Sequence, residues 1–303
     1  MILSASRRTD IPCYFTEWFI NRLKAGYVLT RNPFNHAQLS YVTLSPDVVD
    51  CIVFWTKDPQ NIMPHLKEID AMGYRYYFQF TLTPYDHLIE KNLRHKADIE
   101  QSFIKLSQII GKERILWRYD PIVLNDSLTI PYHKEQFQRL CHKLHSYTKS
   151  VTISFVDTYS KLKTNLIREL SEYEIAELAA FIGNTAKSYG LTAKACCEKT
   201  DLSKYGIEKA SCIDKAVLEQ ICGYSLSLTS DKSQRDGCGC VESVDIGAYN
   251  TCMNSCIYCY ANNSPVTAER RYKSHNIDNE LIIGSVSEGE KITERKVKSN
   301  RTD

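Results

Sequence analysis

Short β-rich runs alternate with helical stretches over the first two thirds of the chain, and this alternation limits the possible folds more than any other feature. The β-rich runs are Ile2–Ser6, Tyr27–Thr30, Ile52–Thr56, Tyr74–Leu82, Arg114–Arg118, Val151–Val156 and Thr192–Cys197. Apolar residues recur with helical spacing in Phe15–Lys24, Asn61–Ala71, Ile99–Ile110, Lys134–His145 and Glu172–Tyr189. Strands separated by helices favour βαβ units, and hence a parallel sheet with helices outside it. We therefore predict an α/β fold, a partial or complete (β/α) barrel of the TIM type, with a doubly wound open sheet as the alternative.

The alternation stops after about Ile221, where the composition changes. Residues from Ser225 to Asn263 are rich in Cys, Ser, Asp, Gly and Asn, and a bound metal can order such a segment without a large apolar core. The tail from Arg270 is charged. We divide the chain into a barrel-like domain, residues 1–222, and a cysteine-rich iron–sulfur segment with the tail, residues 223–303, packed on the barrel.

The charge balance and the cysteine content exclude several kinds of protein. Lys and Arg total 38 against 36 Asp and Glu, a net charge of +2, which argues against a protein that binds nucleic acid backbones. No apolar stretch is long enough to span a bilayer, and the first residues do not resemble a signal peptide. The sequence has no Walker motif and no glycine-rich dinucleotide loop. Twelve cysteines without an export signal indicate a reducing compartment, so we expect a cytoplasmic protein that uses thiols for metal or redox chemistry.

Polar side chains follow the ends of several predicted strands. The carboxyl ends of parallel strands meet at one edge of a sheet, where ligands bind. Taken singly, Arg118 with Asp120 or Lys57 with Asp58 could be a local ion pair. As a set they predict a polar site, whose members are Arg7, Arg8, Lys57, Gln79, Arg118, Asp120, Asp157 and Lys161. Interleaved aromatic residues predict a pocket that stacks a flat ligand, lined by Trp55, Tyr85, Trp117 and Tyr119.

Nine of the twelve cysteines lie between residues 196 and 259, and three of them form a motif. Cys252, Cys256 and Cys259 have the spacing C-x3-C-x2-C, with Tyr258 just before the last cysteine. Three thiolates at this spacing can ligate three irons of a [4Fe–4S] cluster and leave the fourth iron open to a small chelating molecule. A zinc site completed by His275 is the alternative.

This motif resembles that of the radical S-adenosylmethionine (SAM) superfamily. In that superfamily the open iron chelates the amino and carboxylate groups of SAM. One electron from the cluster cleaves SAM to methionine and a 5′-deoxyadenosyl radical, which removes a hydrogen atom from the substrate. The partial (β/α) barrel of those enzymes agrees with the strand pattern, but they carry the motif near the N-terminus and this chain carries it near the C-terminus.

Five strings, spread nearly end to end, carry a second resemblance: Ser6–Pro12, Asn32–Asn35, Phe54–Lys57, Trp117–Ile122 and Asp245–Cys252. Through them the chain resembles an uncharacterised bacterial family, domain of unknown function 1848. Members of that family have a radical-SAM-like cysteine cluster at the C-terminal end. The resemblance implies a cofactor but no substrate.

The remaining cysteines and the histidines receive simpler interpretations. Cysteines in apolar surroundings act as small core residues, and we place Cys51, Cys141 and Cys222 in this class. Five further thiols, Cys196 among them, lie upstream of the motif, and four could bind a second iron–sulfur cluster or zinc, for example Cys197, Cys212, Cys238 and Cys240. The alternative is that these thiols only pack. His133, His142 and His145 share one predicted helix, and we expect surface or capping roles for them.

Together these features predict a radical SAM-like enzyme that acts on an unknown small molecule and receives electrons from a flavodoxin- or ferredoxin-type protein. We expect Arg118 or Lys57 to contact a carboxylate of SAM or the substrate, with Asp120 orienting Arg118. The residues predicted to bind the cofactor are Arg7, Arg8, Gln79, Asp157, Lys161 and Tyr258. One alternative is a non-catalytic iron–sulfur or zinc protein that senses redox state or binds a partner. Another is a nucleic-acid repair lyase, against which the near-neutral charge argues.

Overall fold

An eight-stranded parallel sheet, the main sheet, forms the centre of the protein. The computed structural model describes residues 1–156, 164, 166–198, 200–234 and 237–302. The strand order is β10-β1-β4-β5-β6-β7-β8-β9, and every neighbouring pair is parallel. The strands are β1 (Ile2–Ala5), β4 (Cys51–Thr56), β5 (Tyr76–Thr81), β6 (Ile115–Ile122), β7 (Ser150–Phe155), β8 (Thr192–Cys196), β9 (Glu208–Ala210) and β10 (Val244–Asp245). Apart from β10, the spatial order follows the chain order, as consecutive βαβ units require.

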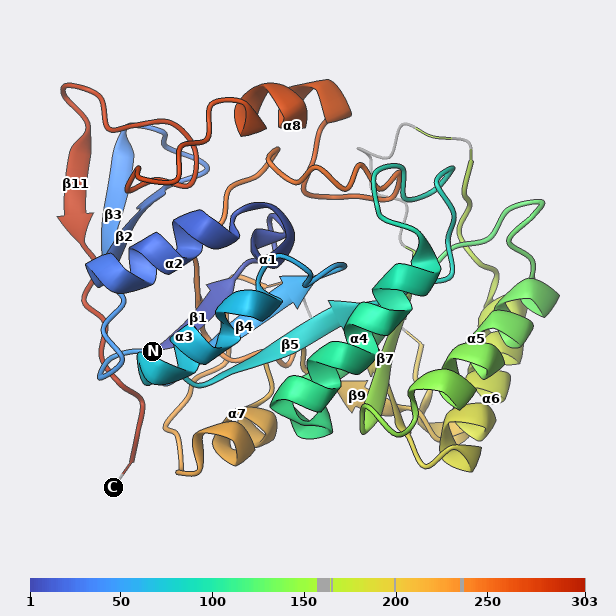
Figure 1. Ribbon diagram of the computed structural model, residues 1–303. Coiled ribbons are helices and arrows are strands. Elements are labelled where there is room, and N and C mark those ends of the chain that lie inside the picture. The colour runs from blue at the N-terminus through green and yellow to red at the C-terminus, as the bar shows by residue number, and fades with distance from the viewer. Residues whose placement is uncertain (157–163, 165, 199, 235–236, 303) are drawn as a thin grey trace.

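Helices connect most of these strands and cover the outside of the sheet (Figure 1). They are α1 (Ile11–Tyr14), α2 (Thr16–Ala25), α3 (Leu66–Ala71), α4 (Lys96–Ile110), α5 (Ile130–Leu144), α6 (Glu172–Ser188), α7 (Lys215–Cys222) and α8 (Pro265–Tyr272), with short 3-10 helices η1 (Met63–His65), η2 (Lys112–Arg114) and η3 (Ser203–Tyr205). Local sequence explains several helix ends. Ser171 and Glu174 form a capping box at the start of α6, and Gly26, in the left-handed conformation, ends α2. All the predicted helices occur, and the stretch predicted from Asn61 is formed by η1 followed by α3.

The main sheet has the strand order of a (β/α) barrel, but a complete barrel is not confirmed. β9 and β10 are its edge strands, and no pairing joins them within the described residues. The observed architecture is a mixed α/β fold with an open parallel sheet. The predicted strand Arg114–Arg118 is longer in the structure, because β6 continues through Pro121 with an irregular register between Tyr119 and Ile122. Proline lacks an N–H group, so the register of the ladder shifts where it lies, but the strand need not end.

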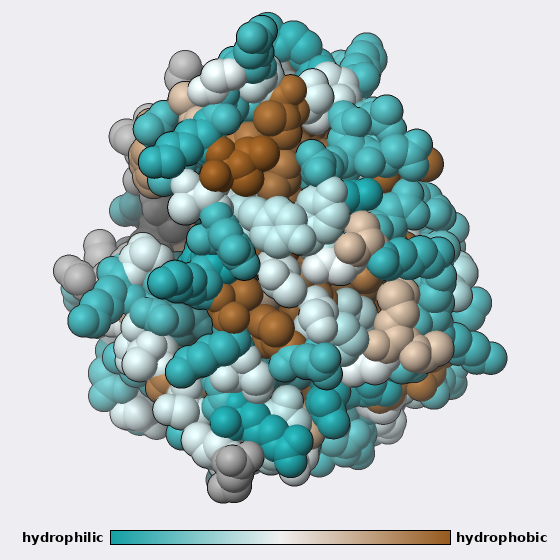
Figure 2. All heavy atoms as spheres, turned by 90° about the vertical axis from the view of Figure 1, so that its left-hand side faces the viewer, coloured by the Kyte–Doolittle hydropathy of each residue, from teal (hydrophilic) through white to brown (hydrophobic). Residues whose placement is uncertain are grey.

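A smaller sheet of order β11-β3-β2 lies beside the first (Figure 1). It contains β2 (Tyr27–Arg31) and β3 (Gln38–Thr43) as an antiparallel pair, and β11 (Lys291–Glu294) parallel to β3. The predicted strand Tyr27–Thr30 therefore belongs to this sheet and not to the parallel one, because a β-rich run does not specify its partner. Figure 2 views this side of the molecule, which is mostly hydrophilic with separate apolar areas. Exposed apolar side chains of this kind, such as Phe34 between β2 and β3, need no partner.

Three of the aromatic residues predicted to line a ligand pocket lie instead in the core. Tyr85, Trp117 and Tyr119 are fully buried. The Trp117 ring stacks on Phe137 with the ring centroids 5.5 Å apart. The Tyr119 hydroxyl lies 2.8 Å from Nδ1 of His133. Aromatic rings supply large apolar surface to a core, so their position near strand ends does not by itself indicate a ligand.

The histidine interpretation is wrong for one residue of α5. His133 is only 1% exposed, and its Nε2 lies 2.8 Å from the carbonyl oxygen of Val123. His142 and His145 are exposed, as predicted. The cysteines predicted to be core residues are buried, and these are Cys51, Cys141 and Cys222.

The cysteine-rich segment packs directly on the main sheet. β10 adds to the edge of β1, with Leu3 opposite Val244. Immediately after β10, a Cβ atom on Gly247 would lie 2.2 Å from Oγ of Ser6, so only glycine permits this close approach. Among the described residues, no helix is both long and apolar enough to cross a membrane.

Candidate functional site

The motif cysteines lie on one loop, residues 252–259, which we call the cysteine loop. It belongs to the orange segment that crosses near the arrowheads of β4 and β5 in Figure 1. Backbone contacts fix its position. Cys256 forms an antiparallel bridge with Glu90, and the amide of Ile257 donates to the carbonyl of Ile89 at 3.0 Å. Glu90 lies in the connection between β5 and α4, so the loop is held at the carboxyl edge of the main sheet.

The side chain of Asn254 holds the first half of the cysteine loop. Its Oδ1 accepts a hydrogen bond from the Tyr14 hydroxyl at 2.8 Å, and its Nδ2 donates to Asp10 at 3.2 Å. Asp10 also accepts the backbone N–H of Lys57 at 2.8 Å. Burial raises the pKa of Asp10 to about 6, although these hydrogen bonds act in the opposite direction. Through Asp10 the loop is joined to the turn after β1 and to the end of β4.

The three thiols of the cysteine loop are partly buried. Burial raises the pKa of Cys252 far above its ordinary value, and the charges of Asp10, Cys259 and Cys256 raise it further. Burial raises the pKa of Cys256 to about 12, against the opposing charge of Lys57. Burial also raises the pKa of Cys259. The thiols are therefore neutral at neutral pH unless a cation ionises them.

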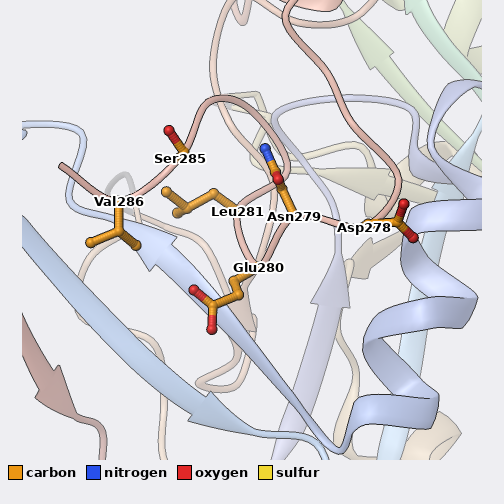
Figure 3. A pocket seen from close by; sticks show the side chains of 6 residues that line it. All are labelled: Asp278, Asn279, Glu280, Leu281, Ser285 and Val286. Carbon is orange, nitrogen blue, oxygen red and sulfur yellow. The ribbon is translucent and has the colours of Figure 1, made fainter.

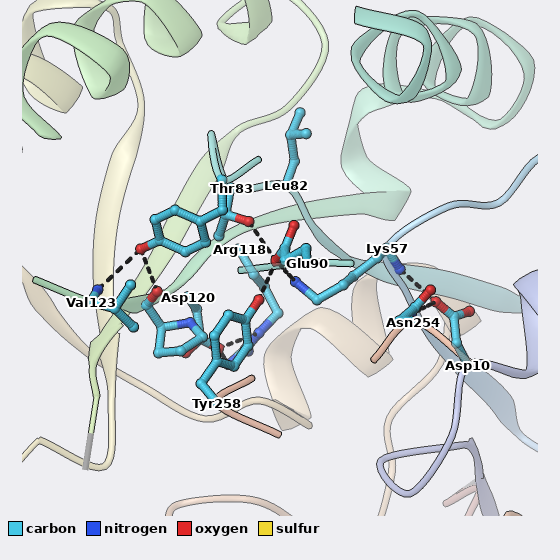
Figure 4. Close-up of polar contacts among 12 residues, drawn as sticks. Asp10, Lys57, Leu82, Thr83, Glu90, Arg118, Asp120, Val123, Asn254 and Tyr258 are labelled. Carbon is cyan, nitrogen blue, oxygen red and sulfur yellow. Dashed lines mark hydrogen bonds and ion pairs between the residues drawn. The ribbon is translucent and has the colours of Figure 1, made fainter. Parts of the chain in front are cut away.

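A buried carboxylate, Glu90, organises the charged groups beside the cysteine loop (Figure 4). It accepts hydrogen bonds from the ammonium groups of Lys57, at 2.7 Å, and Lys96. The hydroxyls of Thr83, at 2.8 Å, and Tyr258 also donate to it. Burial alone would raise the pKa of Glu90, but the charges and hydrogen bonds of the two lysines outweigh it and lower the pKa to about 2. Two lysines around one carboxylate leave an excess positive charge next to the loop.

A second charged group surrounds Arg118 on β6. Its Nε donates to Oδ2 of Asp120 at 3.0 Å, so Asp120 fixes the orientation of the guanidinium. Its Nη1 reaches Oε1 of Gln79 and Sγ of Cys212, both at 3.3 Å. Gln79 is also buried and donates to the carbonyl oxygen of Cys212 at 2.5 Å. This group therefore contacts one of the upstream cysteines.

Arg7 and Arg8, which follow β1, point to different surroundings. The Arg7 guanidinium lies 5.3 Å from the ring centroid of Trp55, and that of Arg118 lies 5.6 Å from the same ring. The Arg8 guanidinium lies 5.1 Å from the ring centroid of Tyr249. Arg7 thus belongs with the group around Arg118, and Arg8 with the segment that follows β10.

The structure divides the predicted site residues into two neighbourhoods. Those beside the cysteine loop are Lys57 and Tyr258. Those around Cys212 are Arg7, Gln79, Arg118 and Asp120. Asp157 and Lys161, also predicted to bind the cofactor, lie outside the described residues.

Four residues of the first neighbourhood were not among the sequence predictions. These are Asp10, Glu90, Lys96 and Asn254. Asp10 lies within the string Ser6–Pro12, and Asn254 lies within the cysteine motif Cys252–Cys259. These positions could have identified both as candidate site residues. Glu90 and Lys96 follow β5, and Glu90 pairs with Lys57, which follows β4. The sequence does not reveal this contact between residues that follow two different strands.

The structure brings Cys196 into the upstream cysteine group, which the predicted set omits. Its Sγ lies 2.7 Å from that of Cys212 and 4.0 Å from that of Cys197. Cys240 also lies against Cys212, and Cys238 packs on the same apolar cluster. In the described part of the chain, no three or more His, Cys, Asp or Glu side chains are already arranged to hold a metal ion.

Two hollows lie in the surface of the described residues. One, of about 250 Å³, is lined by Cys13, Tyr14 and Asn92 and adjoins the cysteine loop, because Asn92 Nδ2 donates to the carbonyl of Met253 at 2.7 Å. It is somewhat smaller than a typical pocket for a small-molecule ligand. The other, of about 130 Å³, is formed by the loop from Asp278 to Val286 beside α2 and β2 (Figure 3). Neither hollow contains Arg118 or Lys57 in its lining.

The fold and the cysteine loop define an α/β protein with a parallel sheet and a cysteine-rich C-terminal segment. The chain matches the family described as "Domain of unknown function (DUF1848)" over residues 2–261, and it belongs to that family. No curated protein matches the chain. Among solved structures, it is similar to a "putative alpha-L-fucosidase" from Bacteroides thetaiotaomicron VPI-5482, with 10% identity over 76% of this chain and 84% of that chain and a TM-score of 0.25. That likeness is too low to inform the fold or the function.

Proposed function

We propose that the protein is a radical SAM-like enzyme in which Cys252, Cys256 and Cys259 ligate a [4Fe–4S] cluster and SAM completes the coordination. The observation that carries the proposal is the placement of a C-x3-C-x2-C loop at the carboxyl edge of a parallel sheet. When bound, the cluster would supply the electron that cleaves SAM, and a flavodoxin- or ferredoxin-type protein would supply that electron in turn. The substrate in this proposal is a small molecule.

The chemistry of the donor set fits such a cluster. The cysteine loop offers three thiols whose pKa values burial raises, so an incoming cation would replace three protons. A cluster with three thiolate ligands is anionic, and Lys57 provides a positive charge beside Cys256. For the alternative zinc site, Nδ1 of His275 lies 2.7 Å from the carbonyl oxygen of Ile282, which leaves Nε2 as the ring nitrogen that could bind zinc.

The protein's own residues have two tasks in this proposal. Asp10 and Glu90 hold the cysteine loop in place, through Asn254 and through the bridge to Cys256. Lys57 or Arg118 contacts a carboxylate of SAM or the substrate. In the present state Lys57 is bound to Glu90 and Arg118 to Asp120, so a ligand carboxylate would have to share these cations with their existing partners.

The proposal is tested with protein purified and reconstituted without oxygen, then mixed with dithionite and SAM. We expect 5′-deoxyadenosine, measured by mass spectrometry, from the wild-type protein. Replacing Cys252, Cys256 and Cys259 by Ala should abolish it. Cys141→Ala, which removes a buried thiol from the apolar core, is the matched control and should retain the activity.

Two results would contradict the proposal. Protein that contains iron and labile sulfide, but whose reduced electron paramagnetic resonance signal does not change with SAM and which forms no 5′-deoxyadenosine, is an iron–sulfur protein without SAM chemistry. Protein that contains only zinc at the cysteine loop has a structural or sensing role. Either result removes the enzyme assignment.

A further inference from the structure

We infer that Cys196, Cys212 and Cys240, the second thiol group, bind a separate thiolate-ligated metal centre at the carboxyl edge of the main sheet. The inference uses residues other than those of the cysteine loop. It therefore does not depend on the proposed SAM chemistry.

The second thiol group is assembled from three separate segments of the chain. Cys196 is the last residue of β8, and it pairs with Ala210 of β9. Cys212 follows two positions later, and its Sγ lies 2.7 Å from that of Cys196. Cys240 comes from the loop that leads to β10 and reaches the same point. The neighbouring carboxyl ends of β8 and β9 account for the approach of Cys196 to Cys212, whereas Cys240, which precedes β10, is held by contacts with the turn after β9.

Backbone contacts hold Cys240 against the turn after β9. The amide of Ile213 donates to Sγ of Cys240 at 3.4 Å, and the amide of Val241 donates to the carbonyl of Ile213 at 3.1 Å. A Cβ atom on Gly239 would lie 2.4 Å from Oγ of Ser211. A side chain at residue 239 would therefore have to displace the Ser211 hydroxyl, next to the turn against which Cys240 is held.

The surroundings of the second thiol group favour negative charge. The three thiols are buried, and Nη1 of Arg118 donates to Sγ of Cys212 at 3.3 Å. Arg7 is also close enough to interact electrostatically with Cys240 and Cys212. Each guanidinium already has a carboxylate partner, Asp120 for Arg118 and Asp231 for Arg7, and thiolates would add further negative charge beside these buried cations.

Two buried N–H groups near these thiols also have no acceptor. Within the described part of the chain, neither Nη2 of Arg7 nor Nε1 of Trp55 has a hydrogen-bond partner. The Trp55 ring centroid lies 5.3 Å from the guanidinium of Arg7 and 5.6 Å from that of Arg118, and Trp55 packs against the apolar cluster that contains the second thiol group. A metal centre with several thiolates is anionic, and its sulfur atoms can accept such hydrogen bonds.

The ligand chemistry selects a soft metal. Thiolates favour zinc or an iron–sulfur cluster over magnesium or calcium. At a zinc–sulfur distance of about 2.3 Å, two thiolates on one tetrahedral ion lie about 3.8 Å apart. The sulfurs of Cys196 and Cys212 would therefore separate by about 1 Å on binding, which a small side-chain rotation provides. Cys197 and Cys238 are the nearest further thiols that could complete the coordination.

The test compares the metal content of two triple variants purified without oxygen. In the first, Cys252, Cys256 and Cys259 are replaced by Ala; in the second, Cys196, Cys212 and Cys240 are replaced by Ser. We expect the first to keep a metal centre, either about one zinc or about four irons with sulfide per chain. The second should lose that same metal. Cys141→Ser, another buried thiol, is the matched control and should lose none.

A second measurement covers the case in which the serine variant does not fold. In the wild-type protein, the second thiol group should resist alkylation until a chelator is added, and mass spectrometry identifies the modified residues. A folded cysteine-loop variant with neither iron nor zinc would overturn the inference and leave the proposed function intact. A disulfide between Cys196 and Cys212 in metal-free protein would also overturn it. If the cysteine-loop variant keeps all the metal of the wild-type protein, the proposed function fails and this inference stands.

Discussion

The two cysteine regions of this protein are built in opposite ways. The cysteine loop takes its thiols from one short stretch of chain, and buried charges around it, chiefly Glu90 with its two lysines, fix its place. The second thiol group takes its thiols from three separate segments, and one of them, Cys212, contacts both Cys196 and Arg118. Local spacing therefore defines the first region, whereas sheet topology defines the second. A sequence motif can report the first kind of site but not the second.

The largest expected effect comes from a change at Lys57, which should weaken the cysteine loop and leave the second thiol group unchanged. Lys57→Met leaves Glu90 buried with one cation fewer, and we expect a loss of about 3 kcal/mol in the free energy of unfolding. The thiols of the cysteine loop should then alkylate faster, with no change at Cys240. Denaturant unfolding and mass spectrometry check both results.

A surface pair provides the control for this change. Lys134 binds Glu177 at 2.6 Å, but both side chains are about one third exposed. Lys134→Met should cost at most about 0.5 kcal/mol. Equal losses in the two variants would show that Glu90 does not support the cysteine loop in the way described.

Acid should lower the stability of the whole fold, and so affect both cysteine regions, through His133, which belongs to neither region. Burial lowers the pKa of His133 to about 4, below the ordinary value of 6.5. Between these values the unfolded chain binds a proton that the folded protein excludes. Stability from this group is therefore fully present above pH 6.5 and is lost as the pH falls towards 4, by about 3 kcal/mol in total.

His133→Gln should flatten this part of the pH dependence of unfolding, measured by denaturant titration from pH 7 to pH 4. The exposed His142→Gln is the matched control and should keep the wild-type slope. If both variants keep that slope, acid sensitivity arises elsewhere. In that case His133 does not contribute to the loss of stability at low pH, and the two cysteine regions can be compared there without its effect.

The smallest expected effect probes the second region alone. Gly239→Ala brings a Cβ atom to 2.4 Å from Oγ of Ser211, and we expect a loss of about 1–3 kcal/mol together with faster alkylation of Cys240. Adding Ser211→Ala removes that oxygen, and the remaining Cβ contact of 3.6 Å is ordinary. The double variant should therefore regain most of the stability. If it regains none, the close approach of Gly239 to Ser211 does not position Cys240.

How much the sequence predicts depends on how local each feature is. The predicted helices and strands follow from periodicity within ten to twenty residues, and their positions agree with the structure, whereas the shorter helices α1, α7 and α8 were not predicted. The partner of a strand does not follow from its own residues, which is why Tyr27–Thr30 was placed in the wrong sheet. Likewise, the residues of β9 and β10 do not reveal that these two strands lie at opposite edges of the main sheet and do not pair among the described residues.

The buried histidine shows a signal that was present but not used. On α5, His133 shares a helical face with Phe137, Leu140 and Leu144, all of which are buried. Its spacing from them is that of a core position. The contact between Glu90 and Lys57 has no comparable signal, because it joins the ends of two neighbouring strands.

The pairing of β1 with β10 also determines the order in which the protein can be completed during synthesis. Leu3 lies opposite Val244, so one edge of β1 stays without its partner until most of the chain has left the ribosome. An unpaired strand edge is a site for wrong association with other chains. The cysteine loop follows β10 directly and emerges later still. If the cysteine loop binds the proposed cluster, iron and sulfide would therefore be inserted after the sheet has assembled, into a nearly complete fold.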